Sequence, residues 1–393
     1  MQETTTFNYF LPTRILFGPG QVRKLHEQQL PGKKALIVIS NGKSTRANGY
    51  LGTVQDELDK AGVAYAVFDK IQPNPTKDNV MGGAVAAKEN SCDFILGLGG
   101  GSCLDASKAI AVMATNPGDL WDYISSGSGK GQALKNKPLP TVNISTTAGT
   151  GSEADPWSVA TNEETMEKIG FGGDAYFPVL SIVDPEMMRS VPPLFTAYQG
   201  FDAFFHSAEG YISKAGNIFT DMCALKAVEL INRYLPKAVQ DGNDLEARTN
   251  VAFGNTLGGF VMSVGSTSSQ HALEQVLSGA YPELAHGAGL IMLSREFFTF
   301  HAGTGNSDER LVAMARAMGN MNASKPMDFV DALVELQKAC GVDALKMSDY
   351  GIRKESLAQF ARDSRKAMSF LFDIDPTMLT DADAQAIMEK SFR

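Results

Sequence analysis

Four residues between positions 202 and 286 carry side chains that could bind a metal ion. Asp202 and His206 are four residues apart, so on a helix their side chains share one face. His271 follows in Ser-Ser-Gln-His-Ala-Leu-Glu, and His286 in Leu-Ala-His-Gly-Ala-Gly. Three imidazoles and one carboxylate, without a thiolate, suit Fe(II), Zn(II) or another borderline divalent ion. The same residue types also serve ordinary packing, so the pattern alone leaves a metal site and a structural role open.

A glycine-rich stretch, residues 97–102, offers a second kind of chemistry. This glycine segment follows an apolar run and precedes a helical pattern whose first turns contain Asp105 and Lys108. Glycines at a strand-to-helix turn let the backbone approach a phosphate, and the helix N-terminus favours negative charge. The spacing is not the usual GxGxxG, so a tight turn without a ligand stays open.

A second stretch of small residues, the threonine segment (residues 146–153), follows another predicted strand. Its hydroxyl groups and backbone N–H groups suit a further part of a nucleotide, although an ordinary loop has the same composition. Two such segments in one sheet, with a candidate metal cluster later in the chain, favour a nucleotide-dependent reaction.

The elements that position these residues differ between the two halves of the chain. Apolar runs predict buried parallel strands at 34–40, 64–68, 94–99, 140–145 and 179–183, with helices at 50–61 and 77–89. Residues 7–17, with Pro12, predict an edge strand or a hairpin. This alternation is typical of a doubly wound, Rossmann-like α/β domain with a mostly parallel sheet.

Helical periodicity dominates after Asp184-Pro185, at 195–214, 220–240, 245–263, 308–318, 326–340 and 354–367. A chain of 393 residues is also too long for one ordinary core. We therefore expect an α/β domain at 1–188 that binds a dinucleotide and an all-helical, metal-binding domain at 189–393. The two glycine-containing segments fall in the first and the metal candidates in the second, with a substrate cleft expected between them.

Composition narrows the function classes and the cellular location. A net charge of −9 without a basic cluster argues against nucleic acid as a partner. No apolar run approaches the roughly 20 residues that span a bilayer, and the first residues do not resemble a signal peptide. Four scattered cysteines without a CxxC pair indicate buried thiols, and we expect a cytoplasmic protein. His26 and His301 have no motif context and are expected to be structural.

Several motifs together make the chain similar, nearly end to end, to the iron-containing (group III) alcohol dehydrogenase family. They are Pro12-Thr-Arg-Ile-Leu-Phe-Gly18, Pro73-Asn-Pro-Thr76, Gly99-Gly-Gly-Ser-Cys-Leu-Asp-Ala-Ser-Lys108, residues 146–153, Asp184-Pro185, and the segments around Asp202, His206, His271 and His286. The opening Phe-x-x-x-x-Pro-Thr-Arg-Ile-Leu-Phe-Gly most resembles the butanol dehydrogenase and aldehyde reductase-like members.

The resemblance implies a dehydroquinate synthase-like two-domain architecture, a nicotinamide dinucleotide and a divalent metal. The implied metal ligands are Asp202, His206, His271 and His286. The implied dinucleotide contacts are Asn74, Gly99, Gly100, Gly101, Ser102, Asp105, Thr146, Thr147, Thr150 and Lys168, with Ser40, Asn41, Gly42 and Lys43 at the ribose end. Fe(II) is the family expectation, and Zn(II) is a substitute.

Two departures from the family pattern bear on mechanism and cofactor. Gln275 stands where many members have a second histidine, and an amide cannot relay a proton near neutral pH. NAD-preferring relatives often have Asp where this chain has Ser40-Asn-Gly-Lys43, with Arg46 nearby. Loss of that charge beside two cations permits a ribose 2′-phosphate, so we expect NADP(H) to be favoured over NAD(H).

The expected activity is hydride transfer between a nicotinamide cofactor and a small primary alcohol or aldehyde, in a homodimer or larger homo-oligomer. Apolar neighbours of the ligands, Phe201, Phe204, Phe205, Leu273 and Val276, favour an uncharged substrate. Two alternatives stay open: an NAD-dependent lyase of the dehydroquinate synthase type, and a non-catalytic nucleotide-binding structural subunit. The lyases typically use Glu with two His, which differs from the set found here.

Overall fold

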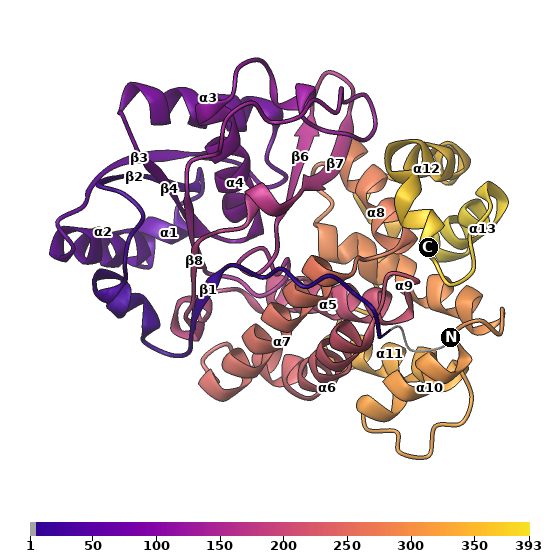
Figure 1. Cartoon of the computed structure of the whole chain (residues 1–393). Helices are drawn as coiled ribbons and strands as arrows, with labels where there is room; N and C mark the ends of the chain where they lie inside the picture. Colours follow the sequence, from indigo (N-terminus) through magenta and orange to yellow (C-terminus); the bar gives the residue numbers. More distant parts are fainter. Residues whose placement is uncertain (1–4) are drawn as a thin grey trace. The chain divides into compact units, whose positions relative to one another are not determined.

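The computed structural model describes residues 5–393, which divide into two compact units (Figure 1). An α/β unit contains Phe10–Ala148 and Ser152–Ser190, and a helical unit contains residues 5–9, Gly149–Gly151 and Val191–Arg393. The expectation that both glycine-containing segments lie wholly in the first half is wrong for Gly149–Gly151, because these residues pack with the helices. The functional division at residue 188 stays a prediction.

Six parallel strands form the sheet of the α/β unit in the order β1-β8-β5-β4-β2-β3 (Figure 1). The strands are β1 (Arg14–Phe17), β2 (Lys34–Ser40), β3 (Ala64–Ile71), β4 (Phe94–Gly99), β5 (Thr141–Ser145) and β8 (Leu180–Val183). The predicted doubly wound α/β fold is confirmed. Of the two possibilities for residues 7–17, the edge strand is the one found, because β1 pairs in parallel with β8 at one end of the sheet.

Helices cover both faces of this sheet, which explains why its strands read as continuous apolar runs. On β2, alternate residues belong to two separate cores: Leu36 and Val38 to one, Ile37 and Ile39 to the other. The first core also holds side chains of α3 (Lys77–Glu89) and α4 (Gly101–Thr115). The second holds side chains of η1 (Gln21–Glu27) and α2 (Tyr50–Lys60), while α1 (Ser44–Ala47) is a single turn after β2.

A separate antiparallel hairpin, β6 (Trp157–Asn162) and β7 (Glu167–Gly172), was not predicted. Its strands carry polar residues and glycines, so neither has the apolar run that marks the central strands. The hairpin packs against α4. Short 3-10 turns complete the α/β unit, at Leu120–Asp122, Asp174–Tyr176 and Pro185–Met188.

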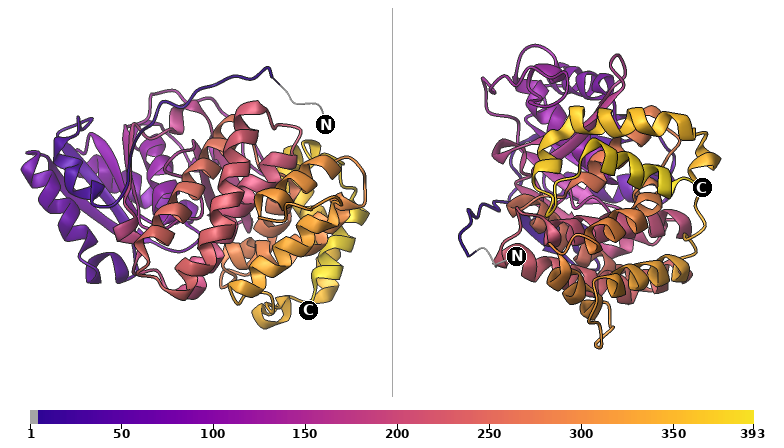
Figure 2. Two further views of the ribbon diagram at one scale, coloured as in Figure 1. Left: turned by 90° about the horizontal axis from the view of Figure 1, so that it is seen from below. Right: turned by 90° about the vertical axis from the view of Figure 1, so that its right-hand side faces the viewer.

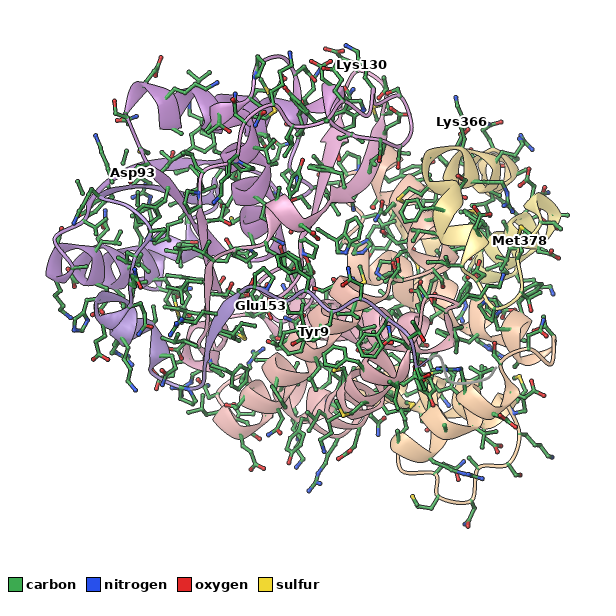
Figure 3. The ribbon with its side chains drawn as sticks, in the orientation of Figure 1. Tyr9, Asp93, Lys130, Glu153, Lys366 and Met378 are labelled. Carbon is green, nitrogen blue, oxygen red and sulfur yellow. The ribbon has the colours of Figure 1, made fainter. Side chains whose placement is uncertain are left out.

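Residues 191–393 of the described chain contain helices and no strand, as predicted (Figure 2). They are α5 (Pro193–Ile212), α6 (Ile218–Gln240), α7 (Leu245–Val264), α8 (Ser269–Ala280), α9 (His286–Ala302), α10 (Asp308–Ala317), α11 (Met327–Ala339), α12 (Leu357–Asp373) and α13 (Asp381–Ser391), with 3-10 turns at Met347–Tyr350 and Lys354–Ser356. Their outer surface is mixed: Lys366 on α12 and Met378 before α13 are both exposed (Figure 3). Within residues 5–393, none of the helices combines the length and apolar character required to cross a bilayer.

Candidate metal centre and cofactor segments

Helix α5 carries the first two candidate ligands on one buried face. Phe201, Phe204 and Phe205 are fully buried, and the last two contact the rings of Phe329 and Phe298. These phenylalanines therefore anchor α5 in the core of the helical unit, and the expectation that they shape substrate choice loses its support. Asp202, on another face, is 4% exposed, and its Oδ1 lies 3.6 Å from His206 Nε2, one turn farther on.

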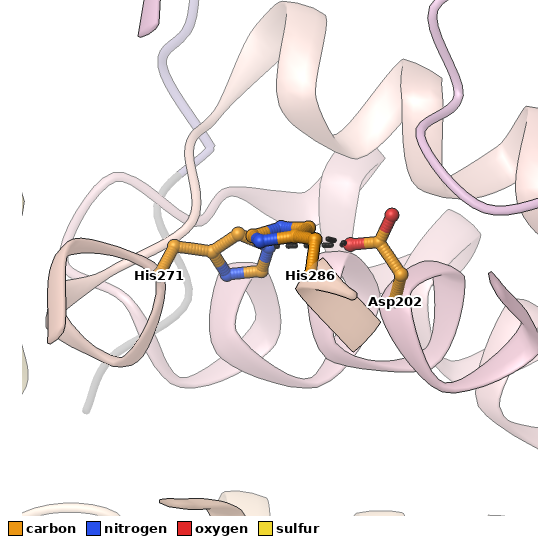
Figure 4. A group of neighbouring side chains, drawn as sticks. All are labelled: Asp202, His271 and His286. Carbon is orange, nitrogen blue, oxygen red and sulfur yellow. Dashed lines mark ion pairs between the residues drawn. The ribbon is translucent and has the colours of Figure 1, made fainter. Parts of the chain in front are cut away.

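Two further helices bring the remaining imidazoles to the same carboxylate. His271 lies in the first turn of α8, and His286 is the first residue of α9. The Nε2 atoms of both lie 3.5 Å from Asp202 Oδ1 (Figure 4). One donor atom from each of Asp202, His271 and His286 lies within 4.8 Å of the others. His206 adjoins this group, since its ring stacks on that of His271 with centroids 4.8 Å apart.

The other ring nitrogen of each histidine is held by a hydrogen-bond acceptor. Glu209 Oε1 accepts from His271 Nδ1 at 2.6 Å, and Glu274 Oε2 accepts from His286 Nδ1. The carbonyl of Gly149 accepts from His206 Nδ1 at 3.2 Å. These acceptors select the tautomer that turns Nε2 towards Asp202, which is the arrangement found around protein-bound metal ions.

Glu209 and Glu274 are functional residues that were missed from the sequence. Both are fully buried, and each follows a histidine by three residues, Glu209 after His206 and Glu274 after His271. A carboxylate at that spacing shares the buried face of its helix, and a buried glutamate is rare unless paired. This spacing was the available signal. Each glutamate also bonds the histidine of a different helix or segment, which spacing alone does not reveal.

The charged groups of the cluster strongly shift one another's pKa values. Burial alone would raise the pKa of Asp202, but the three surrounding imidazoles hold it well below its ordinary value. Burial alone would lower the pKa of His271, yet the carboxylates of Glu209 and Asp202 raise it to about 10. A divalent cation that binds here therefore replaces a proton on an imidazole that already faces a carboxylate.

The donor atoms fit a divalent metal ion. Asp202 Oδ1 and His271 Nε2 are buried and have no hydrogen-bond partner among the described residues. Unpaired buried polar atoms are costly and call for an explanation. Metal–ligand bonds of about 2.1 Å in a tetrahedral arrangement put neighbouring donors about 3.4 Å apart. The three separations of 3.5–3.6 Å from Asp202 Oδ1 match that value.

Gln275 lies on α8, one turn beyond His271, and is 6% exposed. Its Oε1 is buried without a hydrogen-bond partner in the part of the chain that the structure covers. An amide at this position can donate and accept hydrogen bonds, but it cannot take up and release a proton near neutral pH.

The glycine segment and the threonine segment meet at the carboxyl edge of the parallel sheet. The glycine segment ends β4 and opens α4, and the strand order reverses between β2 and β4, where open α/β sheets bind their ligands. A Cβ added to Gly100 would lie 3.1 Å from the Thr147 side chain, so Gly100 and Thr147 are in close approach. Gly101 and Ser102, in the first turn of α4, are partly exposed, as is Thr146. This arrangement leaves backbone groups accessible for a phosphate.

Asp105 lies one turn into α4 and connects the two segments. Its carboxylate accepts from Ser152 Oγ at 2.6 Å and from the backbone N–H of Val159 at 3.0 Å. Burial raises the pKa of Asp105 to about 7. Lys108 is buried beside it and donates to Asp155. These bonds favour a positioning role for Asp105, whose contact with a dinucleotide stays a prediction.

The remaining predicted contacts come from other parts of the chain. Asn74 has a left-handed backbone (φ 52°) just before the Thr76 cap of α3. Lys168 lies on β7 opposite Thr161 and is 6% exposed. Thr150 belongs to the three-residue piece that packs with the helices. Thr161, which pairs with Lys168, also donates its backbone N–H to the carbonyl of Pro75, next to Asn74, so Asn74 and Lys168 are close within the α/β unit. The cofactor contacts of all three stay predictions.

Ser40, Asn41, Gly42 and Lys43 line an open cavity of about 490 Å³ at the end of β2, together with Arg46, Ala47 and Asp69. Asp69 was missed from the sequence. It lies on β3, and its carboxylate pairs with Arg46 at 2.7 Å. The absence of a carboxylate from residues 40–46 therefore does not mean that the cavity lacks one. The carboxyl ends of neighbouring parallel strands meet at one edge of a sheet, which was the signal available for Asp69.

The two histidines without motif context each lie beside a buried carboxylate. His26 Nδ1 bonds the buried carboxylate of Glu57 at 2.5 Å in the α/β unit. His301 is fully buried on α9 with its Nε2 3.9 Å from Asp375, which accepts from the backbone N–H of Ser269. Burial lowers the pKa of His301 to about 3 and raises that of Asp375 to about 7, so both are neutral over a wide pH range.

Comparison with known proteins agrees with this site. Residues 12–185 match the family model "Iron-containing alcohol dehydrogenase", and residues 196–392 match "Fe-containing alcohol dehydrogenase family, C-terminal". "Alcohol dehydrogenase 4" of Saccharomyces cerevisiae is 33% identical over 386 residues, which are 98% of each chain. "Probable NADH-dependent butanol dehydrogenase 1" of Bacillus subtilis is 29% identical over 366 residues, or 90% of this chain and 92% of that one.

Solved structures show the same architecture. The crystal structure of an archaeal halo-thermophilic Red Sea brine pool alcohol dehydrogenase superposes with a TM-score of 0.92 and 32% identity, covering 100% of both chains. These matches support the oxidoreductase over the lyase and the structural subunit, while the choice between NAD and NADP is not set by them. The chain belongs to the iron-containing alcohol dehydrogenase family and is an enzyme that acts on alcohols.

Proposed function

We propose that Asp202, His206, His271 and His286 bind one divalent metal ion and that the enzyme interconverts small primary alcohols and aldehydes with NADP(H). The observation that carries the proposal is the convergence of three imidazole Nε2 atoms on Asp202 Oδ1, at 3.5–3.6 Å, in a buried site. Fe(II) is the expected metal, and Zn(II) is expected to replace it, because an N/O site binds both and availability decides.

A divalent ion held by Asp202, His206, His271 and His286 would supply a Lewis acid for the oxygen of the alcohol or aldehyde. The chain's own residues perform the remaining tasks. Glu209 and Glu274 hold the two imidazoles in the required tautomer and orientation. The glycine segment and Thr146 and Thr147 bind and orient the dinucleotide, so that catalysis is largely a matter of positioning.

The proton of the alcohol requires a route that does not pass through residue 275. A histidine there could relay it, but Gln275 cannot. We expect the proton to leave through water or through a ribose hydroxyl of the cofactor. The buried position of Gln275 keeps it available as a hydrogen-bond partner that orients such a donor.

The preference for NADP(H) over NAD(H) is supported by the cavity at the end of β2. Ser40 stands where NAD-preferring relatives often have Asp, and Lys43 and Arg46 both line the cavity with exposed side chains. A ribose 2′-phosphate placed there would meet two cations, one of which, Arg46, pairs with Asp69. Ser40, Asn41 and Gly42 would contact the same ribose.

Two further aspects are proposed on narrower grounds. A homodimer or larger homo-oligomer is supported by exposed apolar side chains where residues 5–9 meet α6, including Tyr9 and Met222, at 56% and 65%. The mass in solution from light scattering tests it.

A cytoplasmic location is supported by four buried cysteines without disulfides, and cell fractionation tests it.

The test of the metal and substrate assignment uses the full chain and its Asp202→Asn variant, both stripped of metal and reloaded with Fe(II) under anaerobic conditions. Asparagine keeps the shape of the side chain and removes the charge. We expect the parent to bind one metal ion and reduce butyraldehyde, and the variant to lose both properties while keeping dinucleotide affinity. Full metal content and turnover in Asp202→Asn would refute the assignment.

A further inference from the structure

The cavity at the end of β2 contains an ion pair whose position follows from an irregularity of the sheet. Strands β2 and β3 pair residue by residue from Lys34↔Ala64 to Val38↔Phe68, and the next pair is Ser40↔Ile71. One residue of β2 therefore faces two residues of β3, Asp69 and Lys70, which is a β-bulge. A bulge changes the direction in which the following side chains point, and here Asp69 reaches the cavity and Arg46.

Arg46 and Asp69 form an ion pair in an open cavity. Arg46 Nη2 lies 2.7 Å from Asp69 Oδ2, and their side chains are 52% and 48% exposed. An ion pair this exposed to water is weak, because solvent screens it. The guanidinium is therefore free to exchange its carboxylate partner for a stronger one. A phosphate accepts two parallel hydrogen bonds from arginine and carries more charge than a carboxylate.

We infer that the Arg46–Asp69 ion pair sets how strongly this cavity discriminates between a ribose 2′-phosphate and a ribose 2′-hydroxyl. Arg46 is the partner for the phosphate, and Asp69 competes for Arg46 and repels the incoming dianion. With a 2′-hydroxyl, Asp69 accepts a hydrogen bond and keeps its pair with Arg46. The parent enzyme consequently binds both coenzymes, and Asp69 limits the preference for the phosphorylated one. This inference rests on the proposed binding of the adenosine ribose in the cavity.

The probes are 2′,5′-ADP and 5′-AMP, which differ only in the ribose 2′-phosphate, titrated calorimetrically against the metal-free full chain. Replacing Asp69 by asparagine keeps the side-chain shape and removes the charge. We expect Asp69→Asn to bind 2′,5′-ADP about three- to tenfold more tightly and 5′-AMP no more tightly than the parent. Arg46→Gln should weaken 2′,5′-ADP by about tenfold and leave 5′-AMP within about twofold. In the double variant, the gain from Asp69→Asn should disappear.

Glu186→Gln provides the matched control. Glu186 pairs with Arg23 at 2.8 Å on the surface of the same unit but does not line the cavity. Its replacement removes one negative charge from an exposed arginine pair, so both affinities should stay within about twofold of the parent. A general effect of net charge would appear equally in Glu186→Gln and Asp69→Asn, and that result would overturn the inference.

The outcomes separate the inference from the function on which it rests. If the parent binds neither 5′-AMP nor 2′,5′-ADP, the cavity is not the ribose site, and both proposals fail. If the parent binds both and Asp69→Asn changes the two affinities by the same factor, the ribose site stands and the ion pair does not control selectivity. Circular dichroism of each variant tests that replacing these exposed side chains leaves the fold intact.

Discussion

Replacing Glu209 by glutamine should weaken metal binding by about 10- to 100-fold, or about 1.4–2.7 kcal/mol, without unfolding the protein. The Glu209 carboxylate is fully buried and accepts three hydrogen bonds. One comes from His271 Nδ1 at 2.6 Å, and two come from Ser268, from its N–H at 2.9 Å and its hydroxyl at 3.2 Å. It thus fixes both the proposed ligand His271 and the start of the helix that carries it.

Glutamine has the same shape but cannot satisfy all three donors. If its oxygen faces His271, its NH₂ group faces the Ser268 N–H, and two donors oppose each other. If its NH₂ group faces His271, the imidazole must turn its proton to Nε2, which then cannot bind a metal. Either orientation also removes the negative charge that makes the imidazole a stronger ligand. The loss expected from a neighbouring carboxylate of this kind sets the magnitude given above.

The assay is competition for Zn(II) between the metal-stripped protein and a fluorescent chelator, which reports affinity independently of activity. Glu57→Gln is the matched control, since Glu57 is a buried carboxylate bonded to His26 Nδ1 at 2.5 Å in the other unit. That variant should lose stability and keep the parent affinity for zinc. A folded Glu209→Gln protein with zinc affinity within about twofold of the parent would refute the reasoning.

Three other changes test separate parts of the structure. A Cβ on Gly287 would lie 2.6 Å from the Tyr198 carbonyl carbon, so Gly287→Ala should lower the free energy of unfolding by about 3 kcal/mol and weaken metal binding. Gly303→Ala, at the other end of α9, should be tolerated. Thermal melts measure the stability of both variants, and zinc competition measures their metal binding. Burial raises the pKa of Asp375 to about 7, so the folded state holds a proton there that the unfolded state loses above pH 4, and stability falls as pH rises from about 4 to 7, by about 4 kcal/mol at most. Asp375→Asn should remove this loss, giving a melting temperature that exceeds the parent's at pH 8 more than at pH 5; an equal difference at both would count against it. Gln275→His should steepen the acid limb of the pH–rate profile, and an unchanged profile would disprove the proton-relay argument.

Much of the α/β unit was predictable because its strands are buried on both faces. The apolar runs at 34–40 and 94–99 coincide with β2 and β4. The hairpin of β6 and β7 was missed because it lies outside the main sheet, and its polar and glycine residues show no apolar run. In the helical unit, α8, α9 and α13 were not predicted as helices, although the histidines of the first two were recognised.

The candidate site was predictable in its ligands but not in the residues that support them. Residue type and helical spacing indicated Asp202 and His206, and the family motifs indicated the two later histidines. Glu209 and Glu274 each bond a histidine of another helix, and such pairings depend on tertiary structure. Asp69 reaches its cavity only through the pairing and the bulge of β2 and β3, which no local pattern reveals.

The central claim is that a metal ion in this cluster is required for hydride transfer between nicotinamide and a small aldehyde. The most direct measurement is reduction of butyraldehyde by NADPH carrying two deuterium atoms at C4, using metal-free enzyme and the same enzyme reloaded with Fe(II). We predict one deuterium on C1 of the butanol formed by the reloaded enzyme, and no butanol from the metal-free enzyme. Deuterated butanol formed equally fast without metal, or butanol without deuterium, would contradict the claim.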